Sequence, residues 1–241
     1  DPNLQSQEEA AKRAVAAVSA GSRMVFVGGS TGTDGDNVHA TVVSIQEALE
    51  LCSWNASQDA GMSEDDWKVP VVLFPAGAHA LSSAADGITF MMLMNSKNPR
   101  FLIGEQVKGA TWLYENGVEM LPTAYLICEP GGKVGEVGNA IPLTSPEEVI
   151  SYSLCAKGYG MKIVYLEAGS GAAVPVSKDL IQSAAEISDL TLIVGGGIKD
   201  GLAAATAATA GADWIVTGSI TENLTDNNLL RKLLKEVISA I

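Results

Sequence analysis

The sequence predicts an α/β protein of the TIM (β/α)8-barrel class, and three observations support this prediction. Helix-like and strand-like segments alternate along the chain, which is typical of α/β folds. The predicted strands are continuous apolar runs, as expected when both faces of a sheet are covered. The 241 residues, 47% hydrophobic and only 5% aromatic, suffice for one large domain with a sizeable core.

Each predicted element has a local signal. Residues 6–20 are rich in Ala, Glu and Lys, and Gly21 supplies a helix stop signal. Pro70 lies near the start of its strand, where a missing N–H is tolerated. Residues 129–139 are glycine-rich and predict a loop. The predicted strands are 24–27, 69–74, 88–93, 120–127 (which contains Pro122), 162–166, 190–194 and 214–217. The predicted helices are 6–20, 38–51, 99–115, 146–158, 177–188, 200–210 and an amphipathic last helix at 226–240.

The number of strands favours a closed barrel. Each of the seven predicted strands is followed by a helix or a helix-sized segment, and one further helix precedes the first strand. One more strand upstream of Asp1 would complete eight βα units, which suits a barrel of roughly 250 residues. We therefore expect residues 1–241 to form a single barrel domain whose first strand precedes Asp1. The alternative is an open, doubly wound sheet, for which seven strands also suffice.

Two further stretches bear on the organisation of the chain. Residues 20–31 align without gaps with residues 210–221, which indicates either a repeated βα module or the general likeness of helix–Gly–strand–Gly units. Residues 52–68 are polar and acidic without periodicity, and they predict a surface insertion between a helix and the next strand. In a barrel this connection lies on the face away from the chemistry.

The charge balance limits the partners of the protein. Fifteen basic residues against 28 acidic ones give a net charge of −13, so the chain is a poor binder of nucleic acid. Phosphate must then be bound locally, by backbone N–H groups or through a metal ion. Three widely spaced cysteines argue against a disulfide scaffold, and no apolar run approaches the roughly 18–20 residues of a membrane span. We expect a cytoplasmic protein.

Three glycine-containing strand ends follow one another late in the chain, at residues 165–171, 194–198 and 217–219. Glycine lets the backbone approach an anion closely, and the loops after the seventh and eighth barrel strands are the usual phosphate site. With the missing strand counted as the first, Gly195–Gly197 and Gly218–Ser219 fall on those two loops. The sequence therefore predicts an anion site there. The alternative is that these glycines only permit turns.

Candidate chemical groups accompany these loops. Glu167 ends a strand inside a Gly/Ala/Ser loop and is a candidate general base; the alternative is a carboxylate hydrogen-bonded to loop N–H groups. Asp1-Pro2 stands just before a helix, which suits the end of a strand, and Ser30 follows another strand. Both residues offer hard oxygen ligands of the kind that suits Mg²⁺. An aspartate in such a place is also a common helix cap.

An ordered set of motifs over residues 1–222 resembles the geranylgeranylglyceryl phosphate synthase family, the prenyltransferases that make the first ether bond of archaeal lipids. Y-L-E-A-G-S-G at 165–171 resembles the branch of the family with Ala-Gly, rather than Tyr-Ser, in this loop. The other motifs are D-P at 1–2 (family D-P-D-K), V-G-G-S-T-G at 27–32, F-P at 74–75, L-M-N-S-K-N-P at 93–99, P-T-A-Y-L-I-C-E-P-G-G-K-V at 122–134 and V-G-G-G-I at 194–198.

The resemblance implies a TIM barrel that transfers a geranylgeranyl group from geranylgeranyl diphosphate to the 3-hydroxyl of sn-glycerol 1-phosphate, with Mg²⁺ as cofactor. It implies that Asp1 and Ser30 bind the metal and that Glu167 takes the hydroxyl proton. It also implies a homo-oligomer and, because the product is a lipid precursor, transient contact with a membrane. The residues expected to hold glycerol phosphate are Tyr165, Leu166, Glu167, Ala168, Gly169, Ser170, Gly171, Gly195, Gly196, Gly197, Gly218 and Ser219.

One departure from the family pattern lies beside the expected metal ligand, where Asn3-Leu4 replaces Asp-Lys and removes a charge. Two alternatives of the enzyme class stay open: a heptaprenylglyceryl phosphate synthase-like enzyme with a longer prenyl donor, and another phosphate-binding barrel such as an isomerase. A third alternative is a catalytically silent barrel that binds phosphate.

Overall fold

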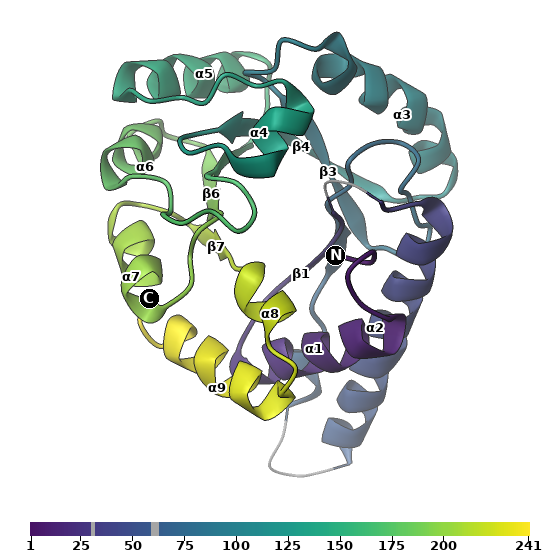
Figure 1. The fold of residues 1–241 in the computed structure, drawn as a ribbon. Helices are drawn as coiled ribbons and strands as arrows, with labels where there is room; N and C mark the ends of the chain where they lie inside the picture. Colours follow the sequence, from purple (N-terminus) through teal and green to yellow (C-terminus); the bar gives the residue numbers. More distant parts are fainter. Residues whose placement is uncertain (30–31, 59–62) are drawn as a thin grey trace. The chain divides into compact units, whose positions relative to one another are not determined.

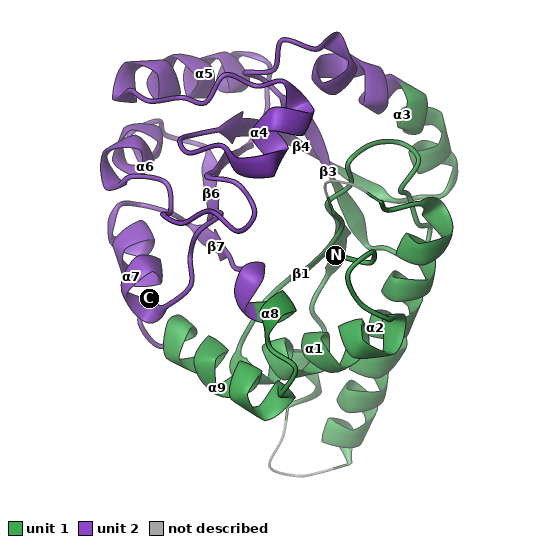
Figure 2. Cartoon of the chain, in the orientation of Figure 1, with its two compact units in different colours: residues 1–89, 108–120, 221–238 green, residues 90–107, 121–220, 239–241 purple. Residues whose placement is uncertain are grey.

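The computed structural model describes residues 1–241 except 30–31 and 59–62 (Figure 1). The chain forms two compact units, which are coloured separately in Figure 2. Unit 1 comprises Asp1–Thr89, Lys108–Met120 and Thr221–Ile238, and unit 2 comprises Phe90–Val107, Leu121–Ile220 and Ser239–Ile241. Each unit is described by itself below, and the single domain expected from the sequence stays a prediction.

The described residues form seven parallel strands that alternate with helices. The strands are β1 (Val25–Val27), β2 (Val71–Leu73), β3 (Gly87–Leu93), β4 (Glu119–Ile127), β5 (Ile163–Glu167), β6 (Thr191–Gly195) and β7 (Trp214–Val216). The helices are α1 (Gln7–Ala20), α2 (Gly35–Ser57), α3 (Glu105–Glu115), α4 (Gly132–Gly138), α5 (Pro146–Gly158), α6 (Lys178–Ala185), α7 (Gly201–Thr209), α8 (Ser219–Asn223) and α9 (Asn227–Ile238).

The order of the strands distinguishes the two predicted architectures. In unit 1 the order is β1, β2 and the first residues of β3, and in unit 2 it is β4 from Leu121 onward, β5, β6 and β7. A doubly wound sheet reverses its strand order at a switch point, whereas a barrel keeps the order of the chain. The fold is therefore the TIM-barrel type of α/β fold that the sequence predicts, and every predicted strand is present.

Unit 1 is organised around α1, which packs against α2 and α9. The helix begins after Ser6, whose side chain accepts a hydrogen bond from the Glu9 N–H, and ends at Gly21 in the left-handed region with φ of 115°. Leu230, Leu234 and Val237 form the buried face of α9, which confirms the amphipathic last helix.

Unit 2 places residues of four strands in one row. Ile127 pairs with Glu167, Glu167 with Gly195, and Gly195 with Val216. The ends of β4, β5 and β6 before this row are buried on both faces, as continuous apolar runs predict, whereas β7 is half-buried to exposed. Figure 1 shows α5, α6 and α7 succeeding one another on the outer side of unit 2. All loops that leave these strands at their carboxyl ends therefore start at the same edge of the sheet.

The structure corrects three boundaries. The predicted loop at 129–139 is wrong in part, because α4 occupies Gly132–Gly138. The predicted end of a helix at residue 51 is also wrong, since α2 continues to Ser57 and takes up the start of the expected 52–68 insertion; a 3₁₀ turn follows at Glu64–Trp67. The predicted helix at 99–115 begins as a π-helical turn, Arg100–Gly104.

None of the described helices has both the length and the apolar character that crossing a bilayer requires.

Candidate functional site

The glycine-containing loops predicted to bind an anion all lie in unit 2, at the carboxyl edge of β5, β6 and β7. Glu167 is the last residue of β5 and Gly195 the last residue of β6, and the two are paired in register. Gly218 follows the end of β7 at Val216, the partner of Gly195. The structure thus brings these three loops to neighbouring strand ends, the usual place for binding in barrels.

The carboxylate of Glu167 is buried at this edge. Its residue is only 6% exposed, and Oε1 accepts a hydrogen bond of 2.7 Å from the backbone N–H of Gly169. The side chains of Tyr165 and Tyr125 are also hydrogen-bonded to the carboxylate. An ionised carboxylate only accepts hydrogen bonds, so both phenols act as donors whenever Glu167 carries its charge.

Burial raises the pKa of Glu167 above its usual range, because the charged form loses its hydration. The hydrogen bonds from Gly169, Tyr165 and Tyr125 act in the opposite direction and lower the same pKa. A carboxylate that binds a proton more readily than in water, yet keeps donors that favour its ionised form, suits a general base. The geometry also contains the N–H contact that the alternative assignment required, so both roles rest on the same side chain.

Three more titratable groups face Glu167 and stay protonated. Burial, followed by the charge of Glu167, raises the pKa of Tyr125 and of Tyr165 well above that of a free phenol. Burial raises the pKa of the Cys128 thiol to about 12. Burial thus favours the neutral form of both phenols and of the thiol around Glu167.

The glycines after β6 are required by close packing. A Cβ atom at Gly195 would overlap the Tyr165 hydroxyl, and one at Gly196 would overlap Glu167 Oε1. Gly196 and Gly197 also have positive φ values of 80° and 72°, which side chains rarely adopt. These glycines therefore do more than permit a turn: they let the β6 loop lie directly on the carboxylate.

The other residues expected to hold glycerol phosphate differ in solvent exposure. Leu166 and Ala168 are fully buried, so only their backbone groups can meet a ligand. Ser170 and Gly171 are exposed, and Gly218 is exposed with nothing within 4 Å of a Cβ built on it. Ser219 begins α8, which the sequence did not predict. The loops thus offer mainly backbone groups, as an acidic chain that binds phosphate requires.

A second glycine loop supports the first. Gly131 and Gly132 follow β4, and a Cβ at Gly169 would lie 2.7 Å from Gly132 Cα and 2.8 Å from the Gly131 carbonyl. Gly169 is the residue whose N–H binds Glu167. The contact between these backbones therefore fixes one of the donors to the carboxylate.

The loop after β3 holds the segment that follows β4 at points other than Gly131 and Gly132. Asn95 is 5% exposed; its Nδ2 donates to the carbonyls of Ile127 (2.8 Å) and Ile141 (2.7 Å), and its Oδ1 accepts from Ile127 N–H. Ser96 Oγ donates to the Gly138 carbonyl at 2.5 Å. Asn95 and Ser96 thereby clamp both the end of β4 and the end of α4.

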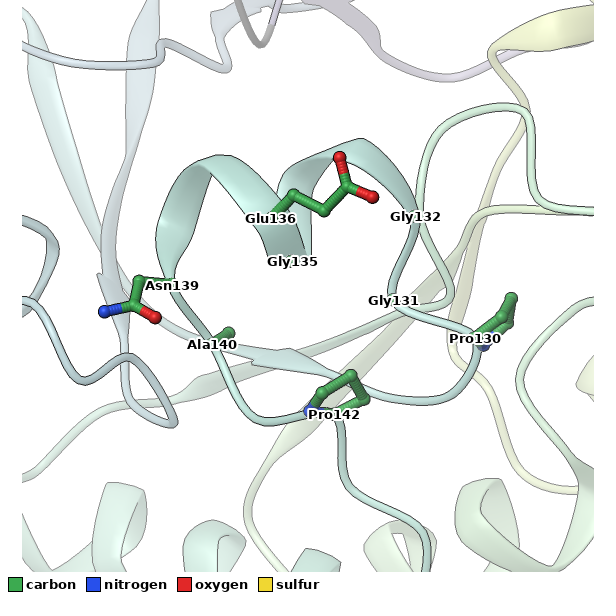
Figure 3. Close-up of a pocket in the computed structure, with 8 residues that line it drawn as sticks. All are labelled: Pro130, Gly131, Gly132, Gly135, Glu136, Asn139, Ala140 and Pro142. Atoms are coloured by element: carbon green, nitrogen blue, oxygen red, sulfur yellow. The ribbon is translucent and has the colours of Figure 1, made fainter.

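The segment between these two anchors lines an open pocket of about 390 Å³. Figure 3 shows its lining along α4 and the turns around it, with the Glu136 side chain pointing away from Pro142. The lining is mainly glycine and proline, and it belongs to the loop that supports Gly169. The lining residues are Pro130, Gly131, Gly132, Gly135, Glu136, Asn139, Ala140 and Pro142.

The expected metal ligands belong to unit 1. The carboxylate of Asp1 lies against Gly29, where a Cβ would overlap it, and Asp1 Oδ1 accepts a 2.9 Å hydrogen bond from Asn3 N–H. Gly29 directly precedes Ser30, which lies outside the described residues. The glycine loop after β1 therefore receives the Asp1 carboxylate. In the described part of the chain, no group of three or more His, Cys, Asp or Glu side chains could hold a metal ion.

Tyr125, Asn95 and the Gly131–Gly132 pair were not singled out from the sequence as functional residues. All lie within motifs that carry the family resemblance, at 93–99 and 122–134. Tyr125 stands in an apolar run, where a tyrosine is ordinarily a core residue. The neighbouring sequence therefore does not predict its hydrogen bond to Glu167. Its place directly opposite Tyr165 in register is visible only in the folded sheet.

Comparison with known proteins identifies the family. The model of a family described as the PcrB family matches residues 53–237. The chain belongs to the PcrB family. This PcrB family member is 43% identical over 244 residues to the geranylgeranylglyceryl phosphate synthase of Methanococcoides burtonii, with 100% of the chain and 90% of that relative covered.

Two solved structures are also similar to this chain. GGGPS from Thermoplasma volcanium has a TM-score of 0.88 and 40% identity, covering 100% of this chain and 89% of that one. (S)-3-O-geranylgeranylglyceryl phosphate synthase from Thermoplasma acidophilum, in complex with its substrate sn-glycerol-1-phosphate, has a TM-score of 0.88 and 34% identity, covering 100% and 90%.

Proposed function

We propose that this protein transfers a geranylgeranyl group from geranylgeranyl diphosphate to the 3-hydroxyl of sn-glycerol 1-phosphate. The observation that carries the proposal is the buried carboxylate of Glu167, held by Gly169 N–H and covered by Gly196, in a chain 43% identical to a geranylgeranylglyceryl phosphate synthase. The Thermoplasma acidophilum relative binds sn-glycerol-1-phosphate, which supports the choice of acceptor.

The residues of unit 2 supply the acceptor half of the reaction. Backbone N–H groups of Gly195–Gly197, Gly218 and Ser219 bind the phosphate, and residues 165–171 hold the glycerol. Glu167 accepts the proton of the 3-hydroxyl as the oxygen attacks C1 of the prenyl group. The new C–O bond forms while the bond from C1 to diphosphate breaks, and the diphosphate leaves with that electron pair. Fixing the acceptor in this orientation lowers the entropic part of the activation free energy.

Asp1 and Ser30 are the residues that would hold Mg²⁺ in this proposal. Asp1 contributes a carboxylate received by Gly29, and Ser30 would contribute a hydroxyl; both are hard oxygen donors, and Mg²⁺ takes few protein ligands and leaves space for phosphate oxygens. When bound, the ion stabilises negative charge on the departing diphosphate. The net charge of −13 makes such a metal a suitable partner for an anionic leaving group.

A direct assay tests the activity. Full-length protein is incubated with labelled sn-glycerol 1-phosphate, Mg²⁺ and either geranylgeranyl or heptaprenyl diphosphate, and a parallel sample contains EDTA. We expect prenylated glycerol phosphate with the geranylgeranyl donor and none after chelation. Product with the heptaprenyl donor alone would identify the longer-chain enzyme instead. Absence of product with both donors would refute the transferase and favour the silent phosphate-binding barrel.

A substitution of Glu167 tests its role as general base. Glu167→Gln keeps the size of the side chain but removes the base, so we expect turnover to fall about 10²–10⁴-fold. Glu186→Gln, an exposed glutamate at the end of α6, is the matched control and should retain the parent rate. Equal rates for the two variants would contradict the assignment of Glu167 as base.

We infer further that the protein works in the cytoplasm as a homo-oligomer. The free cysteines Cys52, Cys128 and Cys155 are compatible with a reducing compartment. The lipid product supports transient contact with a membrane. Light scattering of the purified protein measures the oligomeric state directly.

A further inference from the structure

Tyr125 adds a residue of the neighbouring strand β4 to the hydrogen-bonded groups around Glu167. It lies on β4 directly opposite Tyr165 on β5, and the two rings pack edge to face with centroids 5.2 Å apart and an interplanar angle of 73°. Glu167 lies two residues after Tyr165, so its side chain is on the same face of the sheet as both phenols. Tyr125 is 5% exposed, which leaves its hydroxyl no bulk water to bond.

The carboxylate of Glu167 consequently has three donors from two strands and a loop: Gly169 N–H, Tyr165 and Tyr125. Among the described residues, the titratable groups that face it are Tyr125, Tyr165 and Cys128, all neutral at working pH. A buried charge without a cationic partner depends on such donors, because each one replaces part of the lost hydration.

We propose that Tyr125 is a positioning residue for the transfer reaction: its hydroxyl holds the Glu167 carboxylate ionised and in a single orientation toward the acceptor. The inference rests on the proposed function, since it concerns the same base. Tyr125 reaches the reaction only through Glu167, whereas the packing of its ring on Tyr165 needs no hydroxyl. The two contributions can therefore be separated by removing the oxygen alone.

The test is Tyr125→Phe, which keeps the ring and deletes the donor. We expect kcat to fall about tenfold to a hundredfold, as for loss of a hydrogen bond to a charged group, with KM for sn-glycerol 1-phosphate within twofold. With one donor lost, the carboxylate takes up a proton more readily, so the acidic limb of the kcat–pH profile moves to higher pH. The control is Tyr152→Phe on α5, where a half-buried tyrosine has no contact with Glu167 in the described structure.

A second variant that conserves the fold should shift the acidic limb of the kcat–pH profile in the opposite direction. A fluorinated tyrosine at position 125 is a stronger donor, so the acidic limb should move to lower pH. The ionisation of the substrate phosphate is common to all variants and cancels in the comparison with Tyr152→Phe.

The outcomes separate the two proposals. If Glu167→Gln retains activity, the proposed function of that residue fails whatever Tyr125 does. If Glu167→Gln is impaired while Tyr125→Phe matches Tyr152→Phe, the base stands and the positioning role is overturned. A lower kcat in Tyr125→Phe, with an acidic limb that moves in neither Tyr125 variant, would also overturn it, because an effect on the structure of the site alone gives that result.

Discussion

The space at Gly196 is too small for a methyl group. A substitution at this position therefore tests how closely the β6 loop packs on Glu167. The Gly196→Ala variant would place a Cβ against Glu167 Oε1 and 2.7 Å from Gly169 N, at φ of +80°. We expect at least a tenfold loss of affinity for sn-glycerol 1-phosphate, measured by calorimetry, together with a loss of stability. The left-handed backbone alone costs about 1–2 kcal/mol for a residue with a side chain.

Gly160 provides the matched control, because it has nearly the same φ, +81°, and nothing within 4 Å of its Cβ. The Gly160→Ala variant should carry the backbone cost without the clash. Its affinity for sn-glycerol 1-phosphate should equal that of the parent protein. Equal binding losses in both variants would show that backbone strain, and not contact with Glu167, is responsible.

Single residues differ in how far the sequence reveals them. Glu167 was predictable because a charged residue at the end of an apolar strand stands out from its neighbours. Tyr125 was not, since its chemistry arises from a partner 42 positions away that only strand pairing brings near. Asp1 stays a predicted metal ligand that the family resemblance implies, and its contact with Gly29 depends on tertiary packing that the sequence does not reveal.

Among the elements, α5 has the most complete local signal. The Ser145 side chain accepts a hydrogen bond from Glu148 N–H, the Glu148 carboxylate accepts one from Ser145 N–H, and Pro146 opens the helix. We expect Ser145→Ala to lower the free energy of unfolding by about 1 kcal/mol, as measured in urea.

Ser151, an exposed serine inside the same helix, is the control. Alanine has the higher helix propensity there, so Ser151→Ala should be neutral or stabilise by a few tenths of a kcal/mol, roughly. A loss of stability at Ser151 as large as that at Ser145 would mean that the cap is not the cause.

Elements without such signals could not be predicted. The α4 segment, G-K-V-G-E-V-G, contains three glycines, which are poor helix formers, and it is helical because its ends are held from outside. Ser96 Oγ binds the Gly138 carbonyl, and Lys97 N–H binds the Asn139 carbonyl. The last turns of α2 lack apolar periodicity, but Ala56 is buried and extends the packed face of the helix. Tertiary contacts outweigh propensity in both cases.

At the scale of the whole molecule, the charge of −13 has a measurable cost. Like charges repel more in the compact state than in the unfolded chain, and salt screens that repulsion. Raising NaCl from 20 to 200 mM at neutral pH should therefore increase Tm by about 2–4 °C, the shift that roughly 1 kcal/mol produces in a chain of this size.

The control is the same pair of scans near pH 4.5, the isoelectric point of the sequence. The salt effect should be much smaller there, since the net charge is close to zero. A fall in Tm with salt at neutral pH would indicate that attractive ion pairs, such as Lys157–Asp189, outweigh the repulsion.

The meeting of Gly132 with Gly169 restricts how this site can vary. Their backbones lie so close that a Cβ on Gly169 would be 2.7 Å from Gly132 Cα, and a Cβ on Gly132 would be 3.0 Å from Gly169 Cα. Deletion of a neighbouring side chain cannot relieve an overlap with main chain. Mutational libraries that randomise either position alone should thus return only glycine, and new substrate preferences must be sought in the exposed positions Ser170 and Gly218.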